Sequence, residues 1–193
     1  MEIIGLMGHQ GVGKNFIADL LLKNLPIKNT IIIAFADHFK VDCICKHNCD
    51  YNKIFGEKDF ETRRLLQKVG TEEGRNKFGK NIWINVVETW IKLLNERGVN
   101  RFIISDVRFV NEAEWVKKMN GILIKIDAPK RFKKRLEKET NNNKELIEKI
   151  KNHKSEIMID EYKEYDILIK NDLDDNLEIK KIVKKIDKIL FKN

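Results

Sequence analysis

Short runs of apolar residues recur along the chain, and helix-like sequence follows each of them. The runs are rich in Ile, Leu and Phe, and they are continuous rather than alternating. They are Glu2–Met7, Thr30–Phe35, Arg101–Ser105, Ile122–Ile126 and Ile167–Lys170. Continuous apolar strands separated by helices are typical of a parallel sheet that is covered on both faces. The pattern therefore predicts an α/β protein with these strands in one sheet.

Helical periodicity fills the segments between these strands. Phe16–Leu25 is predicted to form the first helix, and Asn81–Arg97 a longer one that ends before Gly98. Asn111–Met119 is a third predicted helix. The clearest periodicity lies near the end of the chain, where apolar residues recur at spacings of three and four. These residues are Ile179, Ile182, Val183, Ile186, Ile189 and Leu190.

Two longer segments interrupt the alternation of strands and helices. Asp37–Lys80 contains about three helical segments. Pro129–Glu164 is dense in charge, and Asn141, Asn142 and Asn143 mark a turn inside it. The chain shows neither an internal repeat nor a Pro/Ser-rich linker. We therefore predict one domain over residues 1–193, with two helical insertions at 37–80 and 129–164.

Composition narrows the class of protein further. A chain of 193 residues, 42% of them hydrophobic, can bury a proper core. No apolar run approaches the roughly 20 residues of a membrane helix, and the first residues show no secretory signal. The odd number of cysteines fits reduced thiols, so we expect a cytoplasmic protein without a membrane partner. Cys43, Cys45 and Cys49 could also be read as zinc ligands, but their spacing is tight for one tetrahedral site.

The net charge is positive. Lys and Arg number 38 against 30 Asp and Glu, a formal balance of +8. A basic balance favours anionic partners, although the Lys-, Asn- and Ile-rich composition of an AT-biased genome would produce the same excess. Only 8 of the 38 basic residues are arginines. Their positions are therefore more informative than the total.

A phosphate-binding loop follows the first predicted strand. The sequence from Gly8 to Lys14 fits G-x-x-x-x-G-K between a strand and a helix. Glycines let several backbone N–H groups face one anion, and the lysine reaches the outer phosphates of a nucleotide. Asn15 stands where Ser or Thr normally ligates Mg²⁺, although its carbonyl oxygen could do so. The predicted nucleotide-binding residues are Gly8, Gly11, Val12, Gly13, Lys14, Asn15 and Phe16, and Lys14 is also predicted to be catalytic.

A second acidic element ends the third predicted strand. Asp106 follows that strand directly, and in phosphate-loop folds an Asp at this place organises the Mg²⁺ shell. The same residue type also caps helices. Because Arg108 follows two residues later and would face the phosphates, we favour a role in metal binding for Asp106 and in catalysis for both.

The first insertion gathers polar groups suited to a phosphorylated acceptor. Arginine binds phosphate with two parallel hydrogen bonds, which lysine cannot do. We expect one of the adjacent pair Arg63 and Arg64 to be a solvated helix residue, and Trp83 either stacks on a base or fills the core. The predicted acceptor-binding residues are Asp37, Lys40, Arg63, Arg64, Gln67, Gly70, Thr71, Arg75, Trp83 and Arg108.

The second insertion opens with five positive charges in the seven residues 129–135. Such a run is usually a solvated face. Here it follows the fourth strand, at the edge of the sheet where ligands bind in α/β proteins. Arg131 and Arg135 are four residues apart and share one helical face. We predict a lid that brings both arginines onto the transferring phosphates, as catalytic residues.

Further motifs extend over nearly the whole chain, from Gly5 to about Asp172. They are Gly8–Lys14, Phe35–Lys40, Leu66–Arg75, Phe78–Gly79 with Trp83, Ser105–Phe109 with Asn111–Glu112, His153–Glu156 and Asn171–Asp172. In this order they resemble the deoxynucleoside monophosphate kinases, within the wider nucleoside monophosphate kinase-like group. The resemblance implies a three-layer P-loop fold with a five-stranded parallel sheet, an acceptor-binding insertion and an Arg-bearing lid.

The resemblance also implies the activity. ATP with Mg²⁺ would phosphorylate a (deoxy)nucleoside monophosphate, supplying nucleotides for DNA synthesis, in the host cytoplasm if the protein is viral. The expected partners are small nucleotides, with a homodimer left open. Three alternatives remain: a kinase of another phosphorylated acceptor such as phosphomevalonate, a nucleic-acid-associated P-loop ATPase, and a non-catalytic nucleotide-binding module. Gln67 and Trp83 favour a base over an isoprenoid, and the lack of an aromatic-rich basic stripe disfavours a nucleic acid polymer.

Overall fold

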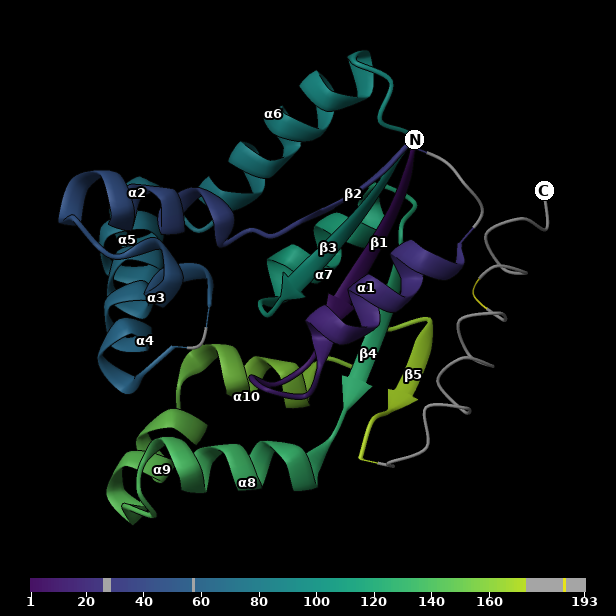
Figure 1. The fold of residues 1–193 in the computed structure, drawn as a ribbon. Helices are drawn as coiled ribbons and strands as arrows, with labels where there is room; N and C mark the ends of the chain where they lie inside the picture. Colours follow the sequence, from purple (N-terminus) through teal and green to yellow (C-terminus); the bar gives the residue numbers. More distant parts are fainter. Residues whose placement is uncertain (26–28, 57, 173–185, 187–193) are drawn as a thin grey trace.

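A computed structural model describes residues 1–25, 29–56, 58–172 and 186 (Figure 1). These residues form one five-stranded, all-parallel sheet in the order β2-β3-β1-β4-β5. The strands are β1 Glu2–Met7, β2 Thr30–Ile33, β3 Arg101–Val107, β4 Ile122–Asp127 and β5 Ile167–Lys170. The prediction of an α/β fold with a five-stranded parallel sheet is confirmed.

Alternate residues of the central strand face opposite layers of helices. Ile4 and Leu6 belong to a buried cluster with Ile17 and Leu21 of α1 (Lys14–Asn24). Ile3 and Met7 point the other way, into a cluster with α6 (Ile82–Glu96) and α7 (Val110–Lys118). Burial on both faces explains why the strands are continuously apolar. The sheet is therefore sandwiched between two helical layers (Figure 1).

Several predicted boundaries shift for reasons that the contacts explain. The second strand was expected to reach Phe35 but ends at Ile33, because the N–H groups of Phe35 and Ala36 donate to Asp106 instead of a ladder. The third was expected to end at Ser105 but continues to Val107, which pairs with Met7 after a register shift.

Helix ends move by one or two residues. The first helix starts at Lys14 rather than Phe16, directly after Gly13 in a left-handed conformation. α6 ends before Gly98, whose φ of 91° supports the predicted stop. The predicted last helix, residues 179–190, lies outside the described residues except for Ile186, which is buried against the α1 layer. None of the described helices is both long and apolar enough to cross a bilayer.

The two insertions leave the sheet at the same edge, where the strands end (Figure 1). The described part of the first insertion has more helices than the three expected. They are α2 Asp37–His47, α3 Tyr51–Phe55, α4 Phe60–Gln67, the π-helix η1 Lys68–Arg75 and α5 Asn76–Phe78. The second forms α8 Pro129–Glu139, α9 Lys144–Lys151 and α10 Lys154–Glu161, with Asn141 and Asn142 in the left-handed turn that the sequence predicts.

The π-helix is shaped by close aromatic neighbours. A Cβ on Gly74 would lie 2.3 Å from the Trp83 ring, and one on Gly70 would lie 3.0 Å from Phe39. The Trp83 Nε1–H donates to the Gly70 carbonyl over 2.7 Å. These contacts hold the π-helix against Phe39 and Trp83.

Gly74→Ala is expected to lower the free energy of unfolding by about 1–3 kcal/mol, because the added methyl group overlaps the Trp83 ring. Chemical denaturation measures this loss. The exposed neighbouring substitution Glu72→Ala is the control and should change stability by less than about 0.5 kcal/mol. Equal stability of the two variants would contradict the packing of Trp83 described above.

Candidate active site

The loop between β1 and α1 has the backbone of an anion cradle. Gly8, Gly11 and Gly13 have φ values of 155°, 83° and 93°, a region that favours glycine. The buried Lys14 ammonium donates to the carbonyls of Gly8 and His9, each over 2.7 Å. Burial lowers the pKa of Lys14 to about 7, and the positive charge of Arg108 adds to that shift. The Lys14 amine is therefore only partly protonated near pH 7, and a nearby anion would raise its pKa.

Residues after β5 fasten this loop from behind. The Asn171 side-chain N–H donates to the Val12 carbonyl over 2.7 Å, and a Cβ on Gly13 would lie 2.4 Å from the same nitrogen. The next residue, Asp172, accepts from the N–H groups of Lys130 and Arg131 at the start of α8. The end of one strand therefore holds both the phosphate loop and the first helix of the second insertion.

A cleft of about 1440 Å³ opens in front of the loop. Most of the residues singled out in the sequence line it, and they come from the loop, both insertions and β3. They are Gly11, Gly13, Lys14, Asn15, Asp37, Lys40, Arg63, Gln67, Gly70, Thr71, Arg75, Trp83, Asp106, Arg108, Arg131 and Arg135. The topology thus brings together groups up to 124 positions apart in the sequence.

Four of the singled-out residues do not line the cleft. Gly8 contributes through its carbonyl to Lys14, and Val12 is fully buried in the core. Phe16 is exposed on α1, and Arg64 is exposed on α4. The expectation that one of the two adjacent arginines is a solvated helix residue thus fits the position of Arg64.

Two carboxylates at the base of the cleft hold the loop after β2. Asp106 accepts the N–H groups of Phe35 and Ala36 over 2.7 and 3.0 Å. Burial raises the pKa of Asp106 above its ordinary value, while Lys40 and Arg108 oppose that shift. Asp37 accepts the Ala34 N–H and pairs with Lys40 at 2.9 Å. Each carboxylate therefore supports the backbone as well as lining the cleft.

The donors at this base are chemically suited to Mg²⁺. Asp106, the Asn15 amide and the Ser105 hydroxyl all line the cleft and offer oxygen, the ligand type that Mg²⁺ prefers. Each Asp106 oxygen makes one hydrogen bond to the backbone and keeps a second lone pair. The donor set therefore fits a hydrated Mg²⁺ ion that also binds substrate phosphates.

Arg75 of the π-helix is held from both sides. It pairs with the buried Glu112 and lies 3.9 Å from the centre of the Phe109 ring. Burial raises the pKa of Glu112 to about 7, and the charge of Arg75 opposes that shift. Glu112 also accepts the backbone N–H groups of Arg108 and Phe109. One carboxylate thus positions two of the arginines predicted to bind the acceptor.

A second carboxylate links the two insertions. Glu139 of α8 lies 3.0 Å from Arg63 of α4 and also pairs with Arg135, one turn back on α8. The Gln10 amide, with its oxygen turned toward α4, accepts from Arg63 as well. Burial together with the nearby Arg135 lowers the pKa of Arg63 to about 10, which still leaves it charged at neutral pH. One arginine from each insertion, Arg63 and Arg135, therefore meet at Glu139.

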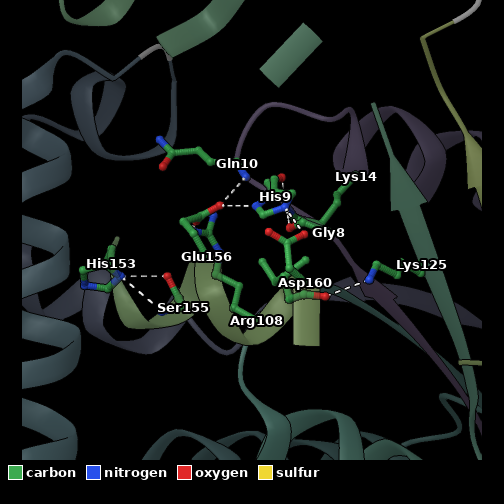
Figure 2. Close-up of polar contacts among 11 residues, drawn as sticks. Gly8, His9, Gln10, Lys14, Arg108, Lys125, His153, Ser155, Glu156 and Asp160 are labelled. Carbon is green, nitrogen blue, oxygen red and sulfur yellow. Dashed lines mark hydrogen bonds and ion pairs between the residues drawn. The ribbon is translucent and has the colours of Figure 1, made fainter. Parts of the chain in front are cut away.

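A third carboxylate, Glu156 of α10, lies between the loop and Arg108. It accepts from His9 over 2.7 Å and faces Arg108 at 3.6 Å (Figure 2). Burial alone would raise the pKa of Glu156, but the His9 hydrogen bond and the charges of Arg108 and Lys14 bring it below its ordinary value. Glu156 is therefore a carboxylate anion.

The sequence singled out the cations of this site but assigned no role to the groups that hold them. Glu156 and Asn171 lie in recognised motifs, whereas nothing in the pattern distinguishes Glu139 from other acids near the basic run. His9 stands at one of the unspecified positions of G-x-x-x-x-G-K, so the motif does not point to a role for it. Lys58 also lines the cleft, and burial together with Lys40 and Arg63 lowers its pKa to about 8.

The three cysteines lie away from this cleft. Cys43 is buried with Ile54 and Val69, whereas Cys45 is exposed. All three are free thiols. Across the part of the chain that the structure describes, no three His, Cys, Asp or Glu side chains are grouped to hold a metal ion.

A parallel sheet with a phosphate loop after its central strand and an arginine-lined cleft is typical of the P-loop kinases. The sequence matches the profile of the deoxynucleotide monophosphate kinases over residues 17–186, which begin just after the loop lysine. The chain is also 32% identical over 190 residues to a protein of Acanthamoeba polyphaga mimivirus that is provisionally named deoxynucleotide monophosphate kinase, covering 89% of each chain. The protein belongs to the deoxynucleotide monophosphate kinase family and is a kinase.

Solved structures agree with the fold. A Thermus thermophilus protein matches with a TM-score of 0.61 at 17% identity, over 100% of this chain and 98% of that one. Shikimate kinase from Aquifex aeolicus matches with a TM-score of 0.53 at 19% identity, over 99% of both chains. Shikimate kinase from Bacteroides thetaiotaomicron gives 0.51 at 16% identity, over 98% of both. The family assignment, rather than these neighbours, favours a nucleotide acceptor over the alternatives.

Arg63→Ala and Arg64→Ala form a matched pair, because the two residues are adjacent on α4 and only Arg63 lines the cleft. We expect Arg63→Ala to lower kcat/KM for the acceptor roughly 10- to 150-fold, which corresponds to about 1.5–3 kcal/mol, as for a lost charge-assisted contact. Arg64→Ala should stay within twofold of wild type. Steady-state kinetics decides, and equal losses in the two variants would place Arg63 outside the acceptor site.

Proposed function

We propose that the protein transfers the γ-phosphoryl group of ATP to a deoxynucleoside monophosphate, giving the diphosphate. One observation above all supports this: the phosphate loop and arginines from both insertions line the same cleft. The acceptor is already a phosphate anion, so the reaction needs no strong general base. Its difficulty is to bring two anionic groups together in line, and positioned cations meet that difficulty.

On the donor side, Lys14 and the loop N–H groups would bind the β- and γ-phosphates of ATP. The Lys14 ammonium would exchange the loop carbonyls for phosphate oxygens. Asp106 and Asn15 would hold Mg²⁺, directly or through water, and the ion would neutralise charge on the phosphates. The residues that would bind the ATP phosphates thus differ from those that would bind the acceptor, which come from other elements.

On the acceptor side, Arg63, Arg75 and Arg108 would neutralise the monophosphate. The residues around the π-helix would receive the base: Trp83, which holds the Gly70 carbonyl, forms one wall, and Gln67 and Thr71 offer an amide and a hydroxyl for its polar edge. Asp37 and Lys40 line the same region and form an ion pair there. Residues 37–80 would thus act as the acceptor-binding insertion.

Residues 129–164 would act as the lid. Arg135 already lies against the loop, where a Cβ on Gly11 would come within 2.2 Å of its side chain. Arg131 lines the cleft from the first turn of α8. Closure over ATP would bring both guanidinium groups onto the transferring phosphoryl group and exclude water, which would otherwise compete as acceptor.

The setting of this activity belongs to the same proposal. Small nucleotides would be its partners, and supply of precursors for DNA synthesis its role. The site of action would be the cytoplasm, which is the host cytoplasm if the protein is viral. A homodimer stays a prediction.

A panel of acceptors tests the function directly. ADP release from ATP and Mg²⁺ is measured with deoxynucleoside monophosphates, the matching ribonucleotides, phosphomevalonate, shikimate and single-stranded DNA. We expect turnover with one or more deoxynucleoside monophosphates and none with phosphomevalonate, shikimate or DNA. Lys14→Ala, with its circular dichroism spectrum unchanged, should abolish turnover. A wild-type protein that prefers phosphomevalonate, or that hydrolyses ATP only with DNA, would overturn the proposal.

Proton uptake tests the role of Lys14. Its pKa of about 7 in the free protein must rise when the charged ammonium meets a triphosphate, so ATP binding at pH 8 should take up about one proton. Affinity for ATP should therefore fall as pH rises above about 7. Calorimetry in two buffers of different ionisation enthalpy measures the uptake.

Lys14→Met should abolish this uptake and weaken binding. Lys23→Met is the control, because Lys23 lies on the same helix and is exposed to solvent. Undiminished uptake in Lys14→Met would assign the proton to another group.

A further inference from the structure

His9 is a phosphate-loop residue whose two ring nitrogens both face carboxylates. Nδ1 lies 2.7 Å from Glu156 and Nε2 lies 2.8 Å from Asp160 (Figure 2). Both acids belong to α10 and stand four residues apart, on one face of that helix. A neutral imidazole has one N–H and cannot donate to both, whereas an imidazolium can. The geometry is that of a cation clamped between two anions.

The surroundings favour the same state. Like charges four residues apart destabilise a helix, and Asp160 lies in the last turn of α10, where a negative charge opposes the helix dipole. A cation between the two acids offsets both effects. The His9 ring also stacks on Phe132 of α8, with centroids 4.6 Å apart and an interplanar angle of 15°. His9 thus joins the phosphate loop to two helices of the second insertion.

The clamp continues to Arg108. Asp160, His9, Glu156 and Arg108 form a line of alternating charge, in which the last contact is the longest, at 3.6 Å. His9 pairs with Oε2 of Glu156 and Arg108 faces Oε1, so the two cations share the charge of one carboxylate, and Arg108 is loosely paired and about one-third exposed. Without the imidazolium, Glu156 would draw Arg108 toward itself and away from an acceptor phosphate.

We propose that His9, held as an imidazolium by Glu156 and Asp160, is a positioning residue that fixes the phosphate loop against α10 and keeps Arg108 available to the acceptor. The effect on the acceptor rests on the proposed function, whereas the contact between the phosphate loop and α10 does not. No part of it requires His9 to touch a substrate.

The dependence on pH has a definite sign. Burial favours the neutral ring, but the hydrogen bonds and charges of Glu156 and Asp160 raise the pKa of His9 above its ordinary 6.5. The clamp is therefore complete below about pH 6.5 and is lost as pH rises through the raised value. Other charged groups near the clamp include Lys14 of α1, Arg108 and His153 and, beside Asp160, Lys125 of β4 and Lys163.

Asp160→Asn is the sharpest variant, because the Asp160 side chain is 71% exposed and its loss should not unfold the protein. Asp160→Glu restores the charge. Glu161→Gln, one residue further along α10 and also exposed, removes the same charge elsewhere. Comparison of these four proteins, wild type included, separates the effect of losing the His9–Asp160 contact from the effect of changing the net charge.

The first measurement is the NMR titration of the imidazole nitrogens, with His9 assigned by comparison with His9→Gln. We expect both His9 nitrogens to be protonated up to a midpoint above that of an ordinary histidine. Asp160→Asn should lower this midpoint by about one unit, the lower end of the effect of an adjacent opposite charge. Asp160→Glu should restore it, and Glu161→Gln should leave it unchanged. A wild-type midpoint at or below the ordinary value would overturn the proposal, whatever the protein catalyses.

The second measurement is the pH profile of kcat/KM for the acceptor, with the dissociation constant of ATP measured in parallel. Lys14 and the substrate phosphates titrate in all four proteins, so the difference between variants reports His9. The alkaline limb should move with the NMR midpoint, which lowers kcat/KM of Asp160→Asn about fivefold at the wild-type midpoint. If the NMR midpoint moves but the alkaline limb of kcat/KM does not, the His9 imidazolium has no effect on the acceptor site. That result would overturn the proposal.

Failure of the proposed function has a different signature. Wild type would then turn over no deoxynucleoside monophosphate at any pH, while the NMR midpoints and the pH dependence of ATP binding would still report on His9. In that case, an ATP affinity that follows the NMR midpoint supports the contact between loop and α10, and an unresponsive affinity overturns it.

Discussion

The structure depends on holding several cations close together in one cleft beside the phosphate loop. Arginine and lysine side chains from α4, η1, α8 and the loop after β3 converge in front of the phosphate loop, and their mutual repulsion opposes that arrangement. Burial lowers the pKa values of Lys14, Lys58 and Arg63, and the repulsion between neighbouring cations adds to these shifts. Three carboxylates, Glu112, Glu139 and Glu156, offset it.

Each of these acids holds cations from different parts of the chain. Glu112 joins the π-helix to the loop after β3, Glu139 joins the two insertions, and Glu156 joins α10 to the phosphate loop and Arg108. Such pairs do little for net stability, since burying charges costs about as much as pairing them returns. Their effect is on geometry: the cations are placed before any phosphate arrives, so less ordering remains when the substrates bind.

Much of the fold followed from the sequence because its signals are local. Continuous apolar runs marked every strand, and glycine or asparagine marked the stops at Gly98 and Asn141. The early end of β2 could not be foreseen from the sequence. The N–H groups of Phe35 and Ala36, which follow the strand, donate to Asp106, about 70 residues further along the chain. In the site, scarce arginines were visible as a pattern, whereas the acids that hold them resemble the many surface acids of a 35% charged chain. His9 shows the limit most clearly, since its role depends on two residues about 150 positions away.

The strand order also has a consequence for how the chain reaches this state. β1, the first of the described strands in the sequence, has both of its partners far downstream, β3 at Arg101–Val107 and β4 at Ile122–Asp127. One edge of β1 therefore stays unpaired until β3 has been synthesised and the other until β4 has been, and long-range parallel pairing is intrinsically slow. The glycine-rich loop that follows β1 acquires its shape later still, because Asn171 supplies the bond to Val12. The side-chain bond that holds the phosphate loop can thus form only after β5 has been synthesised.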